Sequence, residues 1–302
     1  MMNSISIILL LKNGAKFLPE MLSILSKQKG VENLELVVVD SGSTDDGLFI
    51  LEKQRKKITN EGNGAISSIK IIKIKPKEFS HGATRNLGVK TTTGEFVVFL
   101  TQDAIPMSSE WLGILLKPFK KDPLLAGVFG RQIPWPKTNA IEKYFYTQSY
   151  PNQKRLLGKN DSELFSNKNI FFSNVNGAAR KELLLKFPFR EDLVMSEDQF
   201  WGREVLRNGH KLLYEPRAEV MHSHNYNLKK LFFRYYQSGL SQRQMNLAGH
   251  VWKNGSGTFI GLIKYLVRNK PLLLPYAVIY SLVKGGAFFA GRKNLVPRIN
   301  FN

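Results

Sequence analysis

Continuous apolar runs separated by helical patterns constrain the fold of this 302-residue chain more than any other feature of its sequence. Residues 5–11 and 34–39 are runs of the kind found in parallel strands buried on both faces. Between them, residues 17–25 carry apolar side chains at helical spacing, and residues 96–100 form a further run. This alternation predicts an α/β domain with a mostly parallel central sheet flanked by helices.

Weaker patterns fill the rest of the first 226 residues. Residues 134–180 are rich in Tyr, Phe, Asn and Ser, which indicates loops and short helices around a site. Other predicted elements include strands at 69–74, 125–129, 212–214 and 219–221, and helices at 111–119 and 197–207.

The charge of the chain favours anionic partners. Its formal net charge of +20 suits nucleotide phosphates, nucleic acid or an anionic bilayer, and it does not choose among them. The chain has no cysteine, which excludes disulfides, thiolate zinc sites and cysteine nucleophiles and fits a reducing cytosol. We therefore expect any bound metal to have oxygen and nitrogen ligands.

The last quarter of the sequence differs from the rest, and we predict a boundary near residue 226. Domain 1–226 is then the α/β unit, and 227–302 is a helical, basic and aromatic extension. Residues 272–290 are apolar but interrupted by Pro and Gly, which predicts an interfacial helix rather than a membrane span. The basic and aromatic residues 228–236 fit an anionic membrane surface, or equally a helix packed on the catalytic domain. The apolar run 5–11 lacks a basic flank and is interpreted as the first strand.

Acidic and imidazole side chains stand at points where an α/β sheet binds ligands. Asp40 and Asp103 follow buried apolar runs, at the carboxyl ends of predicted strands. Glu197 and Asp198 open a predicted helix, and His222 and His224 are spaced to share one face of an extended segment. Oxygen and imidazole ligands together suit Mg²⁺ or Mn²⁺, and a separate acid leaves a base free for chemistry.

Four motifs in order give the chain a family resemblance. They are residues 37–45 (VVVDSGSTD), 81–88 (HGATRNLG) and 100–104 (LTQDA), and the acids Glu197 and Asp198 followed by the two histidines. With these motifs the chain resembles family 2 glycosyltransferases of the GT-A fold, and among them bacterial rhamnosyltransferases of polysaccharide assembly. The resemblance covers residues 4–226 and implies a GT-A fold with a helical basic C-terminal extension.

The resemblance also implies a nucleotide-sugar site. Asp40 and Ser41 would recognise the base, Arg85 and Asn86 would reach phosphate or ribose oxygens, and Gln102 would line the donor site. Asp103 would hold the divalent metal, Mg or Mn, with His222 or His224. The family usually has an acid where Thr101 stands, so this chain departs from the pattern at one metal-binding position.

The implied reaction is a single inverting displacement. Asp198 would act as the general base on the acceptor hydroxyl, and Glu197 would hydrogen-bond the acceptor or the sugar. The expected donor is dTDP-L-rhamnose, with a UDP- or GDP-sugar as the alternative, and the expected acceptor is a saccharide or lipid-linked saccharide. We expect a cytoplasmic enzyme in peripheral contact with the inner face of the cell membrane and no nucleic-acid partner.

Simpler roles stay open for most of these residues. Asp40 and Asp103 also fit helix caps, Arg85 a surface salt bridge, and the acid pair Glu197–Asp198 ordinary compensation of a helix dipole. We expect donor selectivity to involve the aromatic segment near Trp135 and Tyr144, and a loop at 174–180 that includes Asn176.

Other classes of protein fit less well. A nucleotidyltransferase or a basic membrane- or nucleic-acid-binding scaffold is the remaining alternative. A nicotinamide dehydrogenase and a P-loop enzyme are disfavoured because both glycine-rich signatures are missing.

Overall fold

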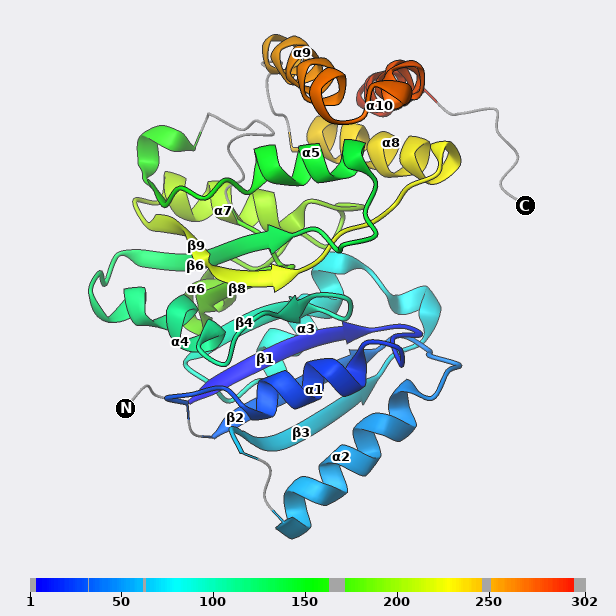
Figure 1. Cartoon of the computed structure of the whole chain (residues 1–302). Coiled ribbons are helices and arrows are strands. Elements are labelled where there is room, and N and C mark those ends of the chain that lie inside the picture. Colours follow the sequence, from blue (N-terminus) through cyan, green and yellow to red (C-terminus); the bar gives the residue numbers. More distant parts are fainter. Residues whose placement is uncertain (1–3, 32, 62–63, 163–171, 246–250, 296–302) are drawn as a thin grey trace.

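One curled sheet forms the centre of the molecule, with helices on both faces and three more helices stacked on one side (Figure 1). The computed structural model describes the chain except residues 1–3, 32, 62–63, 163–171, 246–250 and 296–302. In the described part the sheet has nine strands in the order β3-β2-β1-β4-β8-β6-β9-β5, with β7 pairing on β9. The strands are β1 (Ile5–Leu11), β2 (Leu34–Asp40), β3 (Ile66–Lys73), β4 (Phe96–Thr101), β5 (Ile105–Pro106), β6 (Leu125–Ile133), β7 (Arg155–Leu157), β8 (Asn176–Arg180) and β9 (Lys211–Met221).

The predicted apolar runs form the parallel half of this sheet. Ile8 of β1 lies beside Val37 of β2 and Phe99 of β4, all in parallel register. Side chains along these strands alternate between two cores: Val98 faces the core under α1 and α4, and Phe99 faces the core under α3, α6 and α7. The helices are α1 (Leu18–Ser26), α2 (Gly47–Glu61), α3 (His81–Thr91), α4 (Trp111–Leu116), α5 (Ala140–Ser149), α6 (Lys181–Lys186), α7 (Glu197–Arg207), α8 (Leu228–Gln244), α9 (Val251–Asn269) and α10 (Leu274–Lys293).

The second half of the sheet is mixed, and one prediction for it was wrong. Residues 176–180 form β8, which runs antiparallel to both β4 and β6 in the middle of the sheet and is not a loop. Its small residues pack where larger ones would clash. A Cβ on Gly177 would lie 2.6 Å from the carbonyl of Ser173 and 2.8 Å from the ring of Phe172.

The two short strands predicted at 212–214 and 219–221 are the ends of one strand, β9. Its pairing with β6 shifts register, since Gly130 faces Glu215 and the next residue, Arg131, faces Glu219. The three intervening residues, 216–218, bulge from the ladder, and this bulge interrupts the alternation of the sequence.

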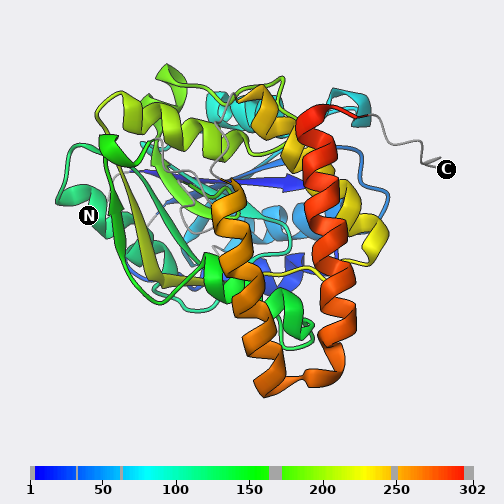
Figure 2. The ribbon, with the colours of Figure 1, turned by 90° about the horizontal axis from the view of Figure 1, so that it is seen from above.

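The C-terminal helices pack on α5 rather than standing apart. A third core joins Ile141 and Tyr144 of α5 to Leu231, Leu262 and Tyr280 of the three last helices. Helices α8 and α10 cross closely, because a Cβ on Gly239 or on Gly291 would lie 2.1 or 2.0 Å from a backbone oxygen of the other helix. Figure 2 shows α9 and α10 side by side across the top of the molecule, with their connecting turn projecting beyond the sheet. The division at residue 226 stays a prediction.

Asn176 supports the strand junction instead of lining a pocket. Its side-chain amide donates to the carbonyls of Ala218 and Arg131, at 2.8 and 3.2 Å, and its Oδ1 accepts from Trp111 Nε1 at 2.9 Å. All of this lies in the interior, where Asn176 is fully buried.

We predict that Asn176→Ala lowers the free energy of unfolding by about 3 kcal/mol, because it leaves buried hydrogen-bond donors and acceptors without a partner. Urea denaturation measures the change, and the exposed Asn152→Ala is the matched control, expected to stay within about 0.5 kcal/mol. A loss for Asn176→Ala no larger than that of the control would contradict this role.

Candidate active site

A cavity of about 550 Å³ opens at the carboxyl ends of β1, β2 and β4. This is the edge at which parallel strands of α/β sheets bind ligands. Segments far apart in the sequence meet there: the β1–α1 turn, the end of β4, the start of α7, the end of β9, and the inner faces of α5 and α8. Among the sequence-predicted site residues, those lining the cavity are Ser41, Arg85, Gln102, Asp103, Glu197, Asp198, His222 and His224.

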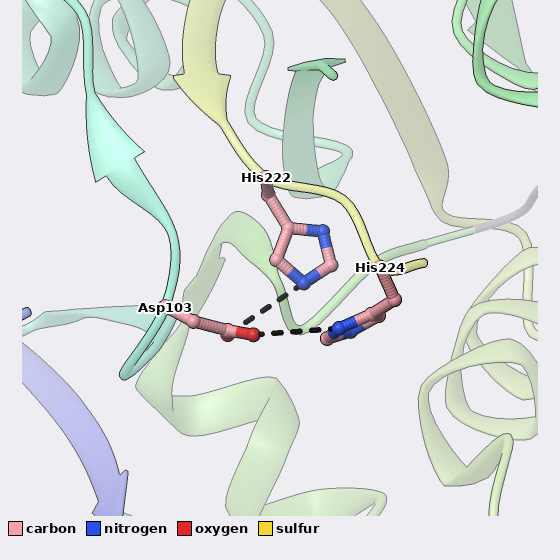
Figure 3. A group of neighbouring side chains, drawn as sticks. All are labelled: Asp103, His222 and His224. Atoms are coloured by element: carbon pink, nitrogen blue, oxygen red, sulfur yellow. Dashed lines mark ion pairs between the residues drawn. The ribbon is translucent and has the colours of Figure 1, made fainter. Parts of the chain in front are cut away.

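Asp103, His222 and His224 form a cluster with the spacing of a metal site (Figure 3). The carboxylate lies 3.6 Å from Nε2 of His222 and 3.8 Å from Nδ1 of His224. One ligand atom from each side chain falls within 4.8 Å of the others. A carboxylate oxygen and two imidazole nitrogens at this spacing are a donor set that fits a divalent transition metal.

Gln132 fixes which nitrogen of His222 faces the cluster. The Gln132 amide donates to Tyr150 Oη at 2.6 Å and to Ser173 Oγ at 3.1 Å, so its Oε1 is left to accept from Nδ1 of His222 at 2.8 Å. That arrangement leaves the Nε2 lone pair of His222 facing Asp103. Burial lowers the pKa of His222 to about 4, against the opposing effect of Asp103, so the ring is neutral at pH 7.

The acids Glu197 and Asp198 are held at a strained turn that begins α7. Ser196 has φ +65°, a left-handed conformation that costs a non-glycine residue about 1 kcal/mol or more. The backbone N–H groups of Asn174 and Gln199 donate to Asp198 at 3.1 and 2.8 Å. The carboxylate therefore lies on the cavity wall in one orientation.

A buried ion pair with Arg85 makes the two acids unequal. The guanidinium of Arg85 lies 2.7 Å from Oε1 of Glu197, and both side chains are less than a tenth exposed. Burial opposes ionisation of Glu197, but the charge of Arg85, together with a hydrogen bond from Asn174, outweighs it, so the pKa of Glu197 lies below its usual value. Burial, together with the neighbouring Glu197 charge, raises the pKa of Asp198 to about 6. A carboxylate that is ionised at neutral pH thus stands beside one whose pKa is about 6.

Not every predicted donor-site residue lines the cavity. The Asn86 amide is occupied away from it, by the backbone of Phe189 and by Oε1 of Glu191. The Asp40 carboxylate accepts from the N–H groups of Gly42 and Ser43 at 3.1 to 3.2 Å and is not among the lining groups. Asp40 holds the turn after β2 and does not cap α2, which begins at Gly47.

Of the aromatic segment expected near the site, Phe145 and Tyr146, next to Tyr144, line the cavity, whereas the two residues named for it do not. Trp135 packs against Phe17 and the core, and Tyr144 lies in the core between α5 and α9. Neither lines the cavity.

The residues that line the cavity instead carry weak sequence signals. Gln132 lies near the end of β6, Tyr146 and Tyr150 lie on and after α5, and Arg234 lies on α8. A helical-wheel pattern shows which residues of α5 and α8 share a face, but it does not show that both faces meet over the sheet.

Comparison with known proteins identifies the class. The family model described as Glycosyl transferase family 2 matches residues 6–184. The chain therefore belongs to this family and is a glycosyltransferase, which leaves the nucleotidyltransferase and scaffold alternatives without support.

Two Salmonella proteins are similar over most of the chain. The O-antigen chain rhamnosyltransferase RfbN of Salmonella typhimurium (strain LT2) is 31% identical over 93% of this chain and 87% of its own length. The O-antigen chain rhamnosyltransferase WbaN of Salmonella anatum is 34% identical over 83% of this chain and 77% of its own length.

Solved structures confirm the GT-A type of fold. The Pyrobaculum calidifontis mannosyltransferase PcManGT, in complex with GDP-Man and Mn²⁺, gives a TM-score of 0.62 at 16% identity, covering 98% of this chain and 76% of that one. A Staphylococcus aureus TarS structure gives 0.56 at 19% identity, covering 95% of this chain and 80% of that one. These likenesses concern the fold alone.

We predict that Asp198→Asn changes stability in a pH-dependent way. The pKa of Asp198 is raised from 3.8 to about 6, so ionising it costs the folded state free energy as the pH rises through that window. The Asn variant lacks this cost. Its unfolding free energy relative to wild type should therefore rise between pH 4 and pH 7, on the order of 2 kcal/mol.

Melting temperatures of both proteins across this pH range measure the effect. Asp192→Asn is the control with the opposite sign, because its hydrogen bond to Arg190 lowers the pKa of Asp192. A pH-independent difference between Asp198→Asn and wild type would contradict the raised pKa.

Proposed function

We propose that this glycosyltransferase transfers L-rhamnose from dTDP-L-rhamnose, with inversion, to a saccharide or lipid-linked saccharide of a cell-surface polysaccharide. The proposal rests on one observation: the same cavity holds the carboxylate of Asp198, whose pKa is about 6, and the cluster of Asp103, His222 and His224. The names of the two Salmonella relatives support the sugar and the pathway class.

The reaction is one displacement. Asp198 accepts the proton of the acceptor hydroxyl while that oxygen forms a bond to the anomeric carbon, and the bond from this carbon to the diphosphate breaks. The nucleoside diphosphate leaves with the electron pair, and Asp198 returns its proton to solvent. Burial and the neighbouring charge of Glu197, which is paired with Arg85, raise the pKa of Asp198 to about 6, close to the pH at which a general base works best.

The donor half of the cavity is built by the parallel strands. Ser41 at the end of β2 donates to the carbonyl of Leu11 at 3.2 Å, and Gln102 is paired with both backbone groups of Lys12. These contacts fix the turn on which the nucleotide would lie, with Asp40 shaping the neighbouring turn for the base. Arg234, which also lines the cavity, supplies positive charge for the diphosphate, while the guanidinium of Arg85 lies at the cavity wall already paired with Glu197.

The cluster of Asp103, His222 and His224 would hold the divalent metal. When bound, the metal would neutralise charge on the departing diphosphate. Two imidazoles among three protein ligands favour Mn²⁺ over Mg²⁺, since Mg²⁺ prefers oxygen ligands throughout.

We predict that dTDP binds more tightly with Mn²⁺ than without it. In His222→Ala, the factor by which Mn²⁺ increases the affinity for dTDP should be at least tenfold smaller. Calorimetric titration of dTDP, UDP and GDP, each with and without Mn²⁺, measures the effect. The control is His210→Ala, since His210 is outside the cavity.

Turnover of dTDP-L-rhamnose then tests the donor, with release of dTDP and a product of opposite anomeric configuration as the expected result. Tight binding of UDP or GDP, with none of dTDP, would overturn the rhamnose assignment and keep the class.

The hairpin of α9 and α10 supports contact with an anionic membrane. Among the described residues, Pro271–Lys293 is the one helical stretch long and apolar enough to cross a bilayer. Its most apolar 18 residues have a mean hydropathy of 1.5, and 17% of them are buried. One face of α10 packs inward through Ala277, Tyr280 and Ala287, so we propose that it lies in the membrane interface rather than across it. Large apolar side chains point outward along the hairpin: Ile260, Val267, Leu272, Val278, Ile279, Leu282 and Phe289.

The positive charge of this surface favours binding to a bilayer leaflet of anionic lipids. Residues 227–302 contain no Asp or Glu, so every carboxylate of the protein's side chains lies elsewhere. Exposed Lys264, Arg268 and Lys270 stand beside the apolar turn at Leu272, which is 95% exposed. Each basic residue near such a leaflet contributes roughly 1 kcal/mol.

We predict that the protein binds vesicles containing about a third phosphatidylglycerol, and that Leu272→Glu with Leu282→Glu weakens binding at least tenfold, because buried apolar contacts are worth about 1.5 kcal/mol or more each. Vesicle flotation at low and high salt is the measurement. Leu124→Glu, at an exposed leucine just before β6 and outside the hairpin, is the control. Equal binding of all three proteins, or none by wild type, would contradict the membrane proposal.

A further inference from the structure

One wall of the cavity is aromatic, and the proposed donor site does not use it. Phe145 and Tyr146 come from α5, Tyr226 from the segment after β9, and Tyr235 from α8. The wall adjoins the metal-type cluster: the ring of Tyr146 lies 6.2 Å from that of His222, and the ring of Tyr226 lies 5.4 Å from that of His224. These side chains are partly exposed, so ring surface is open to the cavity.

Helix α10 braces this wall from behind. The ammonium of Lys284 lies 3.3 Å from the ring centroid of Phe145 and 4.7 Å from that of Tyr235, joining α5 and α8 by two cation–π contacts. The hydroxyl of Tyr280 donates to Oε1 of Glu142, a buried carboxylate that also lines the cavity. The rings and the carboxylate are therefore held in place before any ligand arrives.

Flat aromatic faces and a single carboxylate match the chemistry of a pyranose. The electron-rich face of an aromatic ring attracts the weakly positive C–H groups on one face of a sugar ring. Glu142 has a second carboxylate oxygen with no hydrogen bond among the described residues, and it can accept from a sugar hydroxyl. Sites of this kind combine apolar walls with a few fixed polar groups.

We propose that this aromatic wall, with Glu142 as its polar anchor, is the subsite for the acceptor saccharide. The inference rests on the proposed function and adds where, and by which side chains, the acceptor is bound. Tyr146 and Tyr235 stack on the sugar ring that receives the transfer or on its neighbour. Glu142 accepts a hydrogen bond from one of its hydroxyl groups.

The position of the general base favours an acceptor over a second nucleotide. Tyr150, stacked on Tyr146 at 6.3 Å, lines the same cavity as Asp198. Gln132 donates to both Tyr150 Oη and Ser173 Oγ, and the next residue, Asn174, donates its N–H to Asp198. A sugar held by the wall therefore lies near the base that must take its proton. The nucleotide end of the cavity, at Leu11 and Ser41, is formed by different elements.

The experiment compares variants that separate stacking from other effects. Tyr146→Leu and Tyr235→Leu remove rings on different helices, and Tyr146→Phe keeps the ring and removes the hydroxyl. Glu142→Gln removes the anchor charge, while Tyr280→Phe removes only the group behind it. The probes are octyl glycosides of galactose, mannose and rhamnose, tested with dTDP and Mn²⁺ by saturation-transfer NMR and, with dTDP-L-rhamnose, as acceptors.

We expect saturation transfer from protein aromatic protons to the ring protons of at least one glycoside. Its apparent dissociation constant should rise at least tenfold in Tyr146→Leu, Tyr235→Leu and Glu142→Gln, and less than threefold in Tyr146→Phe and Tyr280→Phe. The affinity for dTDP, measured separately, should stay unchanged in all five.

Two results would overturn the subsite. One is the absence of saturation transfer to every glycoside when the wild-type protein does bind dTDP. The other is an equal affinity for the glycoside in wild type and in the two Leu variants. Failure of wild type to bind any of the nucleoside diphosphates would instead overturn the proposed function. Melting temperatures identify a variant that fails to fold, and the two Leu variants, on separate helices, keep the test decisive.

Discussion

The buried ion pair between Arg85 and Glu197 is the interaction on which the rest of the site depends. It joins α3, at the parallel half of the sheet, to the start of α7, more than a hundred residues later in the chain. Removing one partner of such a pair leaves an uncompensated buried charge, at a cost of about 3–5 kcal/mol. The pair also keeps Glu197 ionised, and this negative charge adds to the larger effect of burial in raising the pKa of the adjacent Asp198. One contact thus joins two elements of the cavity wall and contributes to the basicity of the candidate base.

The charges around Asp103 favour a metal and a diphosphate together over either alone. The cluster offers one carboxylate and two imidazoles that burial keeps neutral. Thr101 is neutral where the family usually has an acid, and its hydroxyl has no hydrogen-bond partner among the described residues. A dication would leave this cluster with net positive charge, to which Arg234 adds. An anionic diphosphate completes the balance, so under the proposed function metal and donor stabilise each other's binding.

The sequence predicted the elements that local patterns determine and missed those that depend on distant partners. Apolar runs identify β1, β2 and β4 because these strands are buried on both faces and rich in branched residues. β8 lacks that signal, because its Asn-Gly-Ala-Ala residues fit only between β4 and β6. Its place in the sheet follows from packing against strands some 50 to 80 residues away, and no local pattern records that.

The sequence likewise predicted part of the site and misplaced another part. Asp103, Asp198 and the two histidines end or begin regular elements, where side chains meet at a sheet edge, and motif order identified them. Arg85 and Asn86 were assigned together although neighbouring residues on a helix point about 100° apart. Arg85 therefore faces the cavity, while Asn86 faces Phe189.

The helices α8 and α10 connect the two proposals about partners. Residues of α8 face the cavity, and α10 contacts the same wall through Tyr280 and Lys284 while its other side exposes Leu282 and Ile279. A sugar stacked on the aromatic wall would thus lie one helix away from the apolar surface proposed to enter the membrane. An acceptor carried on a lipid fits this arrangement, because its lipid can stay in the bilayer while its terminal sugar reaches Asp198. The C-terminal helices would then position the acceptor, and the parallel strands the donor.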